Sequence, residues 1–218
     1  MKTCDVAIIG SGPGGYVAAL YASRKKMKVC VIEKSEVGGT CLNSGCMPTK
    51  SLINSAALLQ EMKDSAKFGL SVADAKIDYQ AAIARKDEAV SRLRSGIETL
   101  FRAGGVDVVK GRARLRRDLA IDVEGAGTVN APNIIIAAGS KAGGIAGVPV
   151  DESAILSSDG ILHMKSVPGS ITIIGGGAIG CEFACLFNAL GSNVTIVEAM
   201  DRILPVQSRE ASKRLESI

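Results

Sequence analysis

One pattern occurs twice in this chain: an apolar run, a glycine-rich turn, a helical stretch and a second apolar run. In the first copy residues 6–9 lead into the turn at 10–15, and in the second copy the turn lies at 175–180. In both copies the first glycine of the turn precedes an acidic residue, Glu33 or Glu198, by 23 positions. A strand, a tight turn and a helix in this order are typical of a βαβ unit. The sequence therefore predicts two such units in one chain.

Both turns follow the pattern G-x-G-x-x-G, in which each glycine has a physical role. Residues without side chains let the backbone approach a pyrophosphate, whose charge is stabilised by the N–H groups at the helix N-terminus. Glu33 and Glu198 would then accept hydrogen bonds from ribose hydroxyls. Turns that bind nothing are the alternative, but both copies have the strand, helix and acidic residue that the motif requires. The motifs predict two Rossmann-like dinucleotide sites.

The second acidic residue also indicates which nicotinamide cofactor is used. A carboxylate at the position of Glu198 repels a 2′-phosphate, and so favours NAD over NADP. Arg202 lies four residues further on and would weaken this inference if its side chain folded back toward the ribose. We expect that it does not.

Between the two copies the sequence predicts helices near 49–63 and 78–103. In the second helix we expect an apolar stripe to face the core, made of Ile83, Val90, Leu93, Ile97 and Leu100. Short strands at 106–109, 112–115, 119–123 and 128–129 are expected to form a small antiparallel meander. A buried strand at 133–136 then runs into a glycine turn, and a connector extends to about Pro149. We place a FAD-type domain at 1–148 and the start of a second, NAD-type domain at 149–218.

Composition narrows the possible functions. The chain of 218 residues has a net charge of only +4, and its densest basic run, 110–117, has no interleaved aromatic residue. We interpret that run as a solvated strand face and expect no nucleic-acid partner. The apolar runs are too short to span a membrane and no export signal is visible, so we expect a cytoplasmic protein. Any disulfide in a reducing compartment is expected to be catalytic.

The segment from Gly38 to Lys50 joins two cysteines, Cys41 and Cys46, to glycines, a proline and a lysine. In an ideal helix residues five apart are separated by a rise of roughly 7.5 Å, which is beyond the usual Cα range of a disulfide. A bridge between them would require a distorted helix start, which Gly45 and Pro48 favour. A zinc pair is the alternative, but no second Cys or His pair follows at metal-site spacing.

With this cysteine segment and both glycine motifs, the chain resembles the class I pyridine nucleotide-disulfide oxidoreductases, most closely their dihydrolipoamide-oxidising branch. The resemblance implies FAD and NAD as cofactors and a redox-active Cys41–Cys46 disulfide. Cys41 would exchange with the substrate, which would be dihydrolipoamide or a lipoyl domain, and Cys46 would face the flavin. Lys50 would lie at the flavin edge with Glu182 as its partner. Another disulfide substrate, or a flavin- or nucleotide-binding fragment without catalysis, are the alternatives.

The catalytic residues implied by the resemblance are Cys41 and Cys46, with no metal. Ala113 would touch the adenine, and Ala138-Gly139-Ser140 would form a second FAD contact, although the family more often has alanine-threonine-glycine there. The full set of cofactor-binding residues expected from the motifs and the resemblance is Gly10, Gly12, Pro13, Gly14, Gly15, Glu33, Lys34, Gly39, Thr40, Cys41, Cys46, Lys50, Ala113, Ala138, Gly139, Ser140, Gly175, Gly177, Ile179, Gly180, Glu182 and Glu198.

The resemblance also implies parts beyond residue 218. Family members continue to a dimer-interface domain that carries a His-Glu pair, so we expect a truncated chain that turns over poorly, and a homodimer for the full-length protein. We expect the other four cysteines to be packing residues: Cys4 and Cys30 on strands, and Cys181 and Cys185 on a helix. The single histidine, His163, is expected at the surface.

Overall fold

The computed structural model describes residues 1–217, and Ile218 lies outside the described residues. The chain forms two compact units, residues 1–48 with 88–149 and residues 49–87 with 150–218. The boundary that we expect between cofactor domains, at 148/149, remains a prediction. Among residues 1–217 no helix is both long enough and apolar enough to cross a bilayer.

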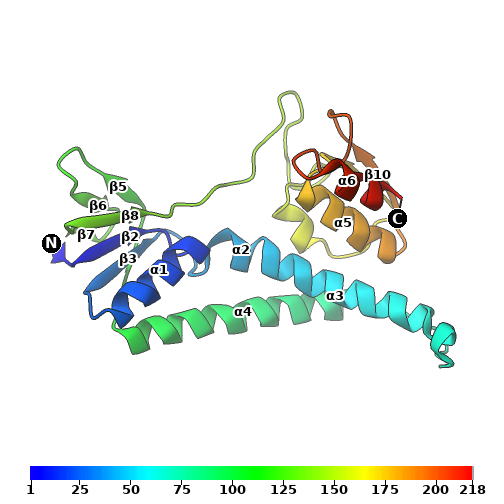
Figure 1. Cartoon of the computed structure of the whole chain (residues 1–218), viewed down its shortest axis with the longest axis horizontal. Helices are drawn as coiled ribbons and strands as arrows, with labels where there is room; N and C mark the ends of the chain where they lie inside the picture. Colours follow the sequence, from blue (N-terminus) through cyan, green and yellow to red (C-terminus); the bar gives the residue numbers. More distant parts are fainter. Residues whose placement is uncertain (218) are drawn as a thin grey trace. The chain divides into compact units, whose positions relative to one another are not determined.

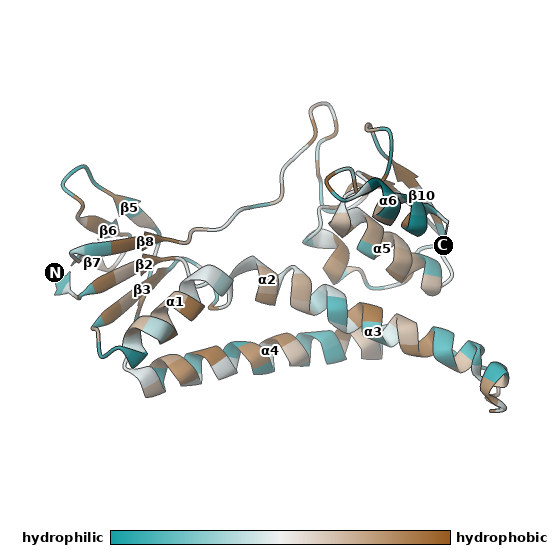
Figure 2. Cartoon of the chain, in the orientation of Figure 1, coloured by the Kyte–Doolittle hydropathy of each residue, from teal (hydrophilic) through white to brown (hydrophobic). Residues whose placement is uncertain are grey.

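The first unit is built on a parallel sheet of four strands in the order β4-β3-β2-β8. These strands are β2 (Val6–Ile9), β3 (Val29–Glu33), β4 (Asp107–Lys110) and β8 (Asn133–Ile136). The central strands β2 and β3 are almost wholly buried and are rich in valine and isoleucine, as expected of strands with neighbours on both sides. Figure 2 shows them as an apolar band. The helix α1 (Pro13–Arg24) connects β2 to β3 and packs on both (Figure 1).

A second sheet in this unit has the order β1-β7-β6-β5. Its strands are β1 (Lys2–Thr3), β5 (Ala113–Leu115), β6 (Ile121–Val123) and β7 (Gly127–Asn130). Strands β5, β6 and β7 are antiparallel, whereas β1 pairs with β7 in parallel. The predicted meander is therefore correct for three strands and wrong for the first, because β4 pairs in parallel with β3. The helix before β4 acts as a crossover that returns the chain in the direction of β3.

The remaining elements of the chain are mostly helical. They are α2 (Gly39–Asn43), α3 (Cys46–Lys63), η1 (Ser65–Phe68), α4 (Tyr79–Gly104), η2 (Gly160–His163), α5 (Ala178–Ala189) and α6 (Arg209–Glu216). In the second unit β9 (Ser170–Ile174) and β10 (Asn193–Val197) pair in parallel, with α5 packed on both. Its core joins Leu52 and Ala56 of α3 and Ala82 of α4 to Phe183 and Phe187 of α5.

Two expectations about burial are wrong, one about the apolar stripe of α4 and one about the strand at 133–136. Leu93 and Leu100 of α4 are 39% and 50% exposed, and the buried position in the last turns of α4 is Phe101 instead. The helix turns by 3.6 residues, so a buried face that includes Val90, Ile97 and Phe101 leaves Leu93 and Leu100 outside it. The strand at 133–136, which we expect to be buried, is mostly exposed, with Ile135 at 38% and Ile136 at 67%, because β8 lies at the edge of its sheet.

Candidate functional site

The first glycine turn joins β2 to α1 by a route that only glycine permits. Gly10 has φ +101°, and a Cβ on it would lie 2.2 Å from the carbonyl oxygen of Ala137. A Cβ on Gly15 would lie 1.9 Å from the carbonyl oxygen of Gly10. Helix α1 then starts after Gly12 with Pro13 in its first turn and no side-chain cap. The N–H groups of that first turn remain available for an anion.

Glu33 ends β3 beside this turn, and its carboxylate is held by three hydrogen bonds. One oxygen accepts from the backbone N–H of Ser11 at 2.8 Å and from the Ser11 hydroxyl at 2.7 Å, and the other accepts from the Ser35 N–H at 2.9 Å. Burial raises the pKa of Glu33, but these hydrogen bonds outweigh it, so that the pKa lies below its ordinary value. Glu33 is therefore a charged, fixed acceptor at neutral pH.

A cleft of about 760 Å³ opens over the turn. Of the residues predicted to bind cofactor, those that line it are Gly10, Gly12, Pro13, Gly14, Glu33, Lys34, Gly39, Thr40, Cys41, Ala113, Ala138, Gly139 and Ser140. The cleft is also lined by ten residues that were not predicted from the sequence: Ile9, Ser11, Ile32, Ser35, Glu36, Asn43, Ser44, Gly111, Arg112 and Ala137. Ser11, Ser35, Arg112 and Ala137 each adjoin a predicted contact in the sequence, which is the signal that could have found them. The volume is in the range of cofactor sites.

The cysteine segment packs directly on the glycine turn. Gly39 has φ +63°, and a Cβ on it would lie 2.6 Å from the Cα of Gly12. The backbone N–H of Gly38 also donates to the carbonyl of Ser11 at 3.1 Å. These close approaches bring Cys41 to the cleft wall. The glycines of this segment thus pack the cysteine motif directly on the first glycine turn.

The expected distortion between the two cysteines is present. Helix α2 ends at Asn43, Ser44 leaves helical geometry with φ −142°, and α3 begins at Cys46. Cys41 is partly buried and lines the cleft, whereas Cys46 is exposed. The expected disulfide between them remains a prediction.

The second glycine turn, in the second unit, repeats the geometry of the first. Gly175 has φ +107°, and a Cβ on Gly180 would lie 2.0 Å from the Gly175 carbonyl oxygen. Glu198 accepts from the N–H of Gly176 at 2.6 Å and from the N–H of Met200 at 2.9 Å. The Met200 and Gly176 hydrogen bonds lower the pKa of Glu198. Gly177 has open space at its Cβ position, and Ile179 is 60% exposed.

Arg202 does not contact Glu198 through any hydrogen bond or ion pair described for residues 1–217. Its guanidinium donates to the carbonyl of Pro205 at 2.8 Å and lies 3.3 Å from the carboxylate of Asp201. Glu198 therefore keeps both oxygens on backbone N–H groups, as Glu33 does in the first unit. Among the contacts described for residues 1–217, no cation neutralises the Glu198 carboxylate.

Lys50 on α3 and Glu182 on α5 form an ion pair within the second unit. Both side chains are partly exposed, at 54% and 36%. Neither residue lines the cleft of the first unit. The pairing of Lys50 with Glu182, which the family resemblance implies, is present and joins residues 132 positions apart in the chain.

The other four cysteines and the histidine differ in how deeply they are buried. Cys4, Cys30 and Cys181 are buried, and desolvation raises the pKa of Cys30 to about 12. Cys185 is exposed on α5, contrary to its expected packing role, because it lies on the outer side of that helix. His163 is exposed, as expected. In the part of the chain that the structure describes, no three His, Cys, Asp or Glu side chains form a metal-binding group.

Together the fold and the cleft define the Rossmann-like class of α/β proteins. The family described as pyridine nucleotide-disulphide oxidoreductase matches residues 4–218, and the chain belongs to it. This is a family of flavin-dependent oxidoreductases, which implies FAD as a cofactor.

Similar proteins agree with this assignment. The chain is 44% identical over 211 residues to dihydrolipoyl dehydrogenase of Chlamydia pneumoniae, covering 96% of this chain and 46% of that protein. It is 38% identical over 226 residues to a dihydrolipoyl dehydrogenase of Bacillus subtilis, covering 98% and 48%. Among solved structures, the HOCl-induced flavoprotein disulfide reductase RclA from Escherichia coli has a TM-score of 0.81 at 31% identity, with 98% and 46% covered. The chain thus spans about half the length of these relatives.

Proposed function

We propose that the cleft binds FAD and that the protein is the corresponding part of an NAD-dependent dihydrolipoyl dehydrogenase. The observation that carries this proposal is that Cys41 lines the same cleft as the glycine turn and Glu33. A redox-active sulfur and a dinucleotide cradle would then serve one cofactor. The relatives named dihydrolipoyl dehydrogenase, at about 40% identity, support this substrate class.

The residues present fit FAD. The side-chain-free positions Gly10, Gly12 and Gly14 line the cleft at the start of α1, where a pyrophosphate would meet backbone N–H groups. Glu33 is charged and has further lone pairs for ribose hydroxyls. Ala113 and the segment 138–140 also line the cleft. Ala113 would contact the adenine, and the segment 138–140 would contact another part of FAD.

The cysteines would pass an electron pair from substrate to flavin. A thiolate of dihydrolipoamide attacks the Cys41 sulfur of the Cys41–Cys46 disulfide and releases Cys46 as thiolate. The second substrate thiol then attacks the substrate sulfur of the mixed disulfide, which frees Cys41 and leaves lipoamide as a cyclic disulfide. Two electrons have moved to the cysteine pair and two protons have left the substrate. FAD held by the first glycine turn and Glu33 would supply the chemistry that converts this electron pair into a hydride for NAD.

The second unit would supply the NAD site. Gly175, Gly177, Ile179 and Gly180 would form the phosphate turn, and Glu198 would bind the ribose of NAD. The Lys50–Glu182 ion pair would lie at the flavin edge, as the family resemblance implies. We further propose a cytoplasmic homodimer for the full-length protein.

A second candidate is the reduction of another disulfide substrate. It is favoured by the likeness to a flavoprotein disulfide reductase with a TM-score of 0.81. The glycine turns and cysteine segment would serve either direction of electron flow, so substrate identity has to be measured.

The test compares the two reactions on purified, FAD-loaded protein. One assay follows NADH formation from NAD and dihydrolipoamide, and the other follows NADPH-driven reduction of small disulfides. We expect the first reaction to be the faster, and Cys41→Ser to abolish it. Cys185→Ser is the matched control, because Cys185 is an exposed cysteine on α5 outside the cleft. Flavin binding with activity only in the second assay would favour the second candidate, and absence of bound flavin would refute both.

A further inference from the structure

Asn43 lies between the two cysteines in the sequence, and its half-buried side chain is hydrogen-bonded at both its nitrogen and its oxygen. Its side-chain nitrogen donates to the carbonyls of Val37 and Gly39, both at 3.0 Å, and lies 3.5 Å from the carbonyl of Glu36. Its side-chain oxygen accepts two hydrogen bonds from Arg94. The amide therefore ties α2 to the loop that precedes it and to a helix distant in sequence.

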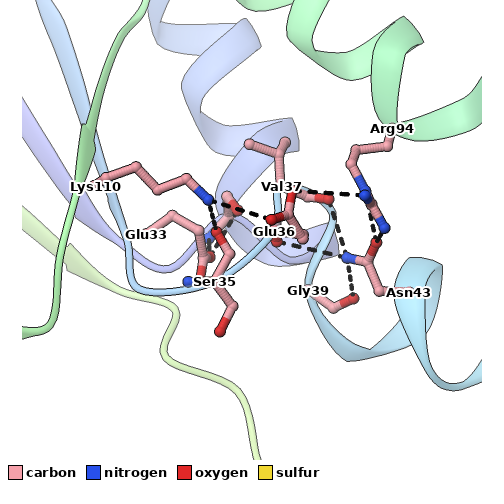
Figure 3. Close-up of polar contacts among 9 residues, drawn as sticks. Glu33, Ser35, Glu36, Val37, Gly39, Asn43, Arg94 and Lys110 are labelled. Atoms are coloured by element: carbon pink, nitrogen blue, oxygen red, sulfur yellow. Dashed lines mark hydrogen bonds and ion pairs between the residues drawn. The ribbon is translucent and has the colours of Figure 1, made fainter. Parts of the chain in front are cut away.

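Arg94 on α4 supplies the other half of this contact. Its Nε and Nη2 atoms donate to the Asn43 oxygen at 3.0 and 2.8 Å, and its Nη1 lies 3.6 Å from the carboxylate of Glu36. Figure 3 shows the guanidinium directed at Asn43. The Arg94 side chain is only 31% exposed, so its charge is partly shielded from water. A two-point contact of this kind fixes orientation as well as distance.

The Cys41 segment needs such a restraint, because α2 has only five residues. A helix this short is not stable on its own. Leu42 is 6% exposed and anchors α2 in the core of the first unit. Leu42 and the close packing of Gly39 on Gly12 hold one side of α2, and the Asn43 amide adds a restraint at its C-terminal end. The Asn43 amide thus contributes to the position of Cys41 at the cleft wall.

Residues 33–39 connect the Asn43–Arg94 contact to the glycine turn and Glu33. Lys110 donates to the carbonyl of Ser35 and lies 3.6 Å from the Glu36 carboxylate. Figure 3 shows both contacts of Lys110. The N–H of Ser35 in turn donates to Glu33. Residues 33–39 therefore carry both the ribose carboxylate and the carbonyls that hold Asn43.

We propose that Asn43 and Arg94 are positioning residues that hold Cys41 at the cleft wall in the geometry needed for electron transfer. This inference rests on the proposed function for its role in electron transfer, but its structural part, the restraint on Cys41, does not. Neither residue is a catalytic group, because both act through the position of the cysteine.

The test uses Asn43→Ala and Arg94→Gln in FAD-loaded, reduced protein, with Arg92→Ala as control. Arg92 lies two residues from Arg94 on α4, but its side chain is 78% exposed and pairs only with Glu88 in the described contacts of residues 1–217. Iodoacetamide labelling, located by mass spectrometry, gives the alkylation rate of each cysteine. We expect Cys41 to be alkylated about 10-fold faster in both variants. Cys30, which is fully buried in β3, should be alkylated as slowly as in the unaltered protein.

The alkylation rate of Cys30 distinguishes a local release of Cys41 from general unfolding, because unfolding would accelerate the alkylation of both cysteines. A second readout is the rate at which dithiothreitol reduces the flavin of the oxidised protein, which should fall by about 10-fold or more. Cys41 alkylation within about twofold of the Arg92→Ala control in both variants would overturn the proposal. If Asn43→Ala does not fold, the milder Arg94→Gln decides the question. If the unaltered protein shows no flavin reduction, the proposed function fails and the alkylation rates still test the restraint.

Discussion

Ser11 donates both its backbone N–H and its hydroxyl to one carboxylate oxygen of Glu33. Ser11 is the second residue of the first glycine turn, and the second residue of the other turn, Gly176, donates its N–H to Glu198 in the same way. Each turn is thus tied to the acidic residue that its own βαβ unit places at the end of the next strand. This contact fixes the ribose acceptor relative to the phosphate turn before any ligand binds.

Substitution of Glu33 by glutamine should destabilise the first unit by about 2 kcal/mol at neutral pH, because an amide cannot accept all three hydrogen bonds. The folded-state pKa of Glu33 lies below the ordinary value of 4.5. Its stabilisation is therefore complete above about pH 4.5 and is lost as the pH falls through the lower folded pKa. Urea unfolding at pH 7 and pH 3 should show the difference between the two proteins shrinking at acid pH. An unchanged difference would argue against a charged Glu33.

Two glycines of the first turn should respond differently to alanine. Gly15→Ala should cost about 3 kcal/mol or more, because its Cβ would overlap the Gly10 carbonyl. Gly12→Ala should fold, since its Cβ would meet only the Cα of Gly39 at 3.8 Å, but it should bind FAD weakly because the methyl group occupies the approach to the backbone. Thermal unfolding and flavin retention measure the two effects. Normal flavin binding by Gly12→Ala would place the pyrophosphate elsewhere.

The Lys50–Glu182 ion pair should contribute little to stability. Both side chains are more than a third exposed, and pairs of this kind are worth about 1 kcal/mol or less. We expect Lys50→Met to change the free energy of unfolding by no more than that, yet to slow flavin reduction by about 10-fold or more. Lys67→Met, which removes the exposed Lys67–Asp64 pair, is the control and should affect neither. Equal rates in the two variants would remove Lys50 from the proposed flavin site.

Neighbouring positions near the end of α4 test the burial pattern. Phe101 is 1% exposed and packs in the core of the first unit, whereas Leu100 is 50% exposed. Phe101→Ala should destabilise the protein by about 3–5 kcal/mol. Leu100→Ala should change stability by about 0.5 kcal/mol or less. Similar losses for both variants, measured by chemical denaturation, would indicate that Leu100 is covered in solution.

The sequence was sufficient to predict the two βαβ units, because the glycine turns and the acidic residue are local features with fixed spacing. It also indicated a break between Cys41 and Cys46, since Gly45 and Pro48 disfavour a continuous helix. The parallel pairing of β4 with β3 could not be predicted from local sequence features. It depends on which strand lies next to β4 after the chain has crossed over through α4. Leu93 and Leu100 fit an apolar stripe by spacing alone, but spacing does not show which stripe of a long helix meets the core.

The contact between Asn43 and Arg94 was not predictable from the sequence. Asparagine and arginine are common on exposed helix surfaces, and these two are 51 positions apart. Only the packing of α4 against the cysteine segment brings them together. The hydrogen bonds between Ser11 and Glu33 were not predicted either. They depend on how the glycine turn and the end of β3 lie side by side in the folded βαβ unit.

The central claim is that Cys41, Cys46 and a flavin in the cleft form one redox unit. Anaerobic titration of the oxidised, FAD-loaded protein with dithionite, followed by flavin absorbance, tests it most directly. The unaltered protein should take up about two equivalents of this two-electron reductant per flavin, because the cysteine pair stores one electron pair and the flavin another. Cys46→Ser should take up about one equivalent. Bleaching of the unaltered protein by about one equivalent, as in Cys46→Ser, would contradict the account.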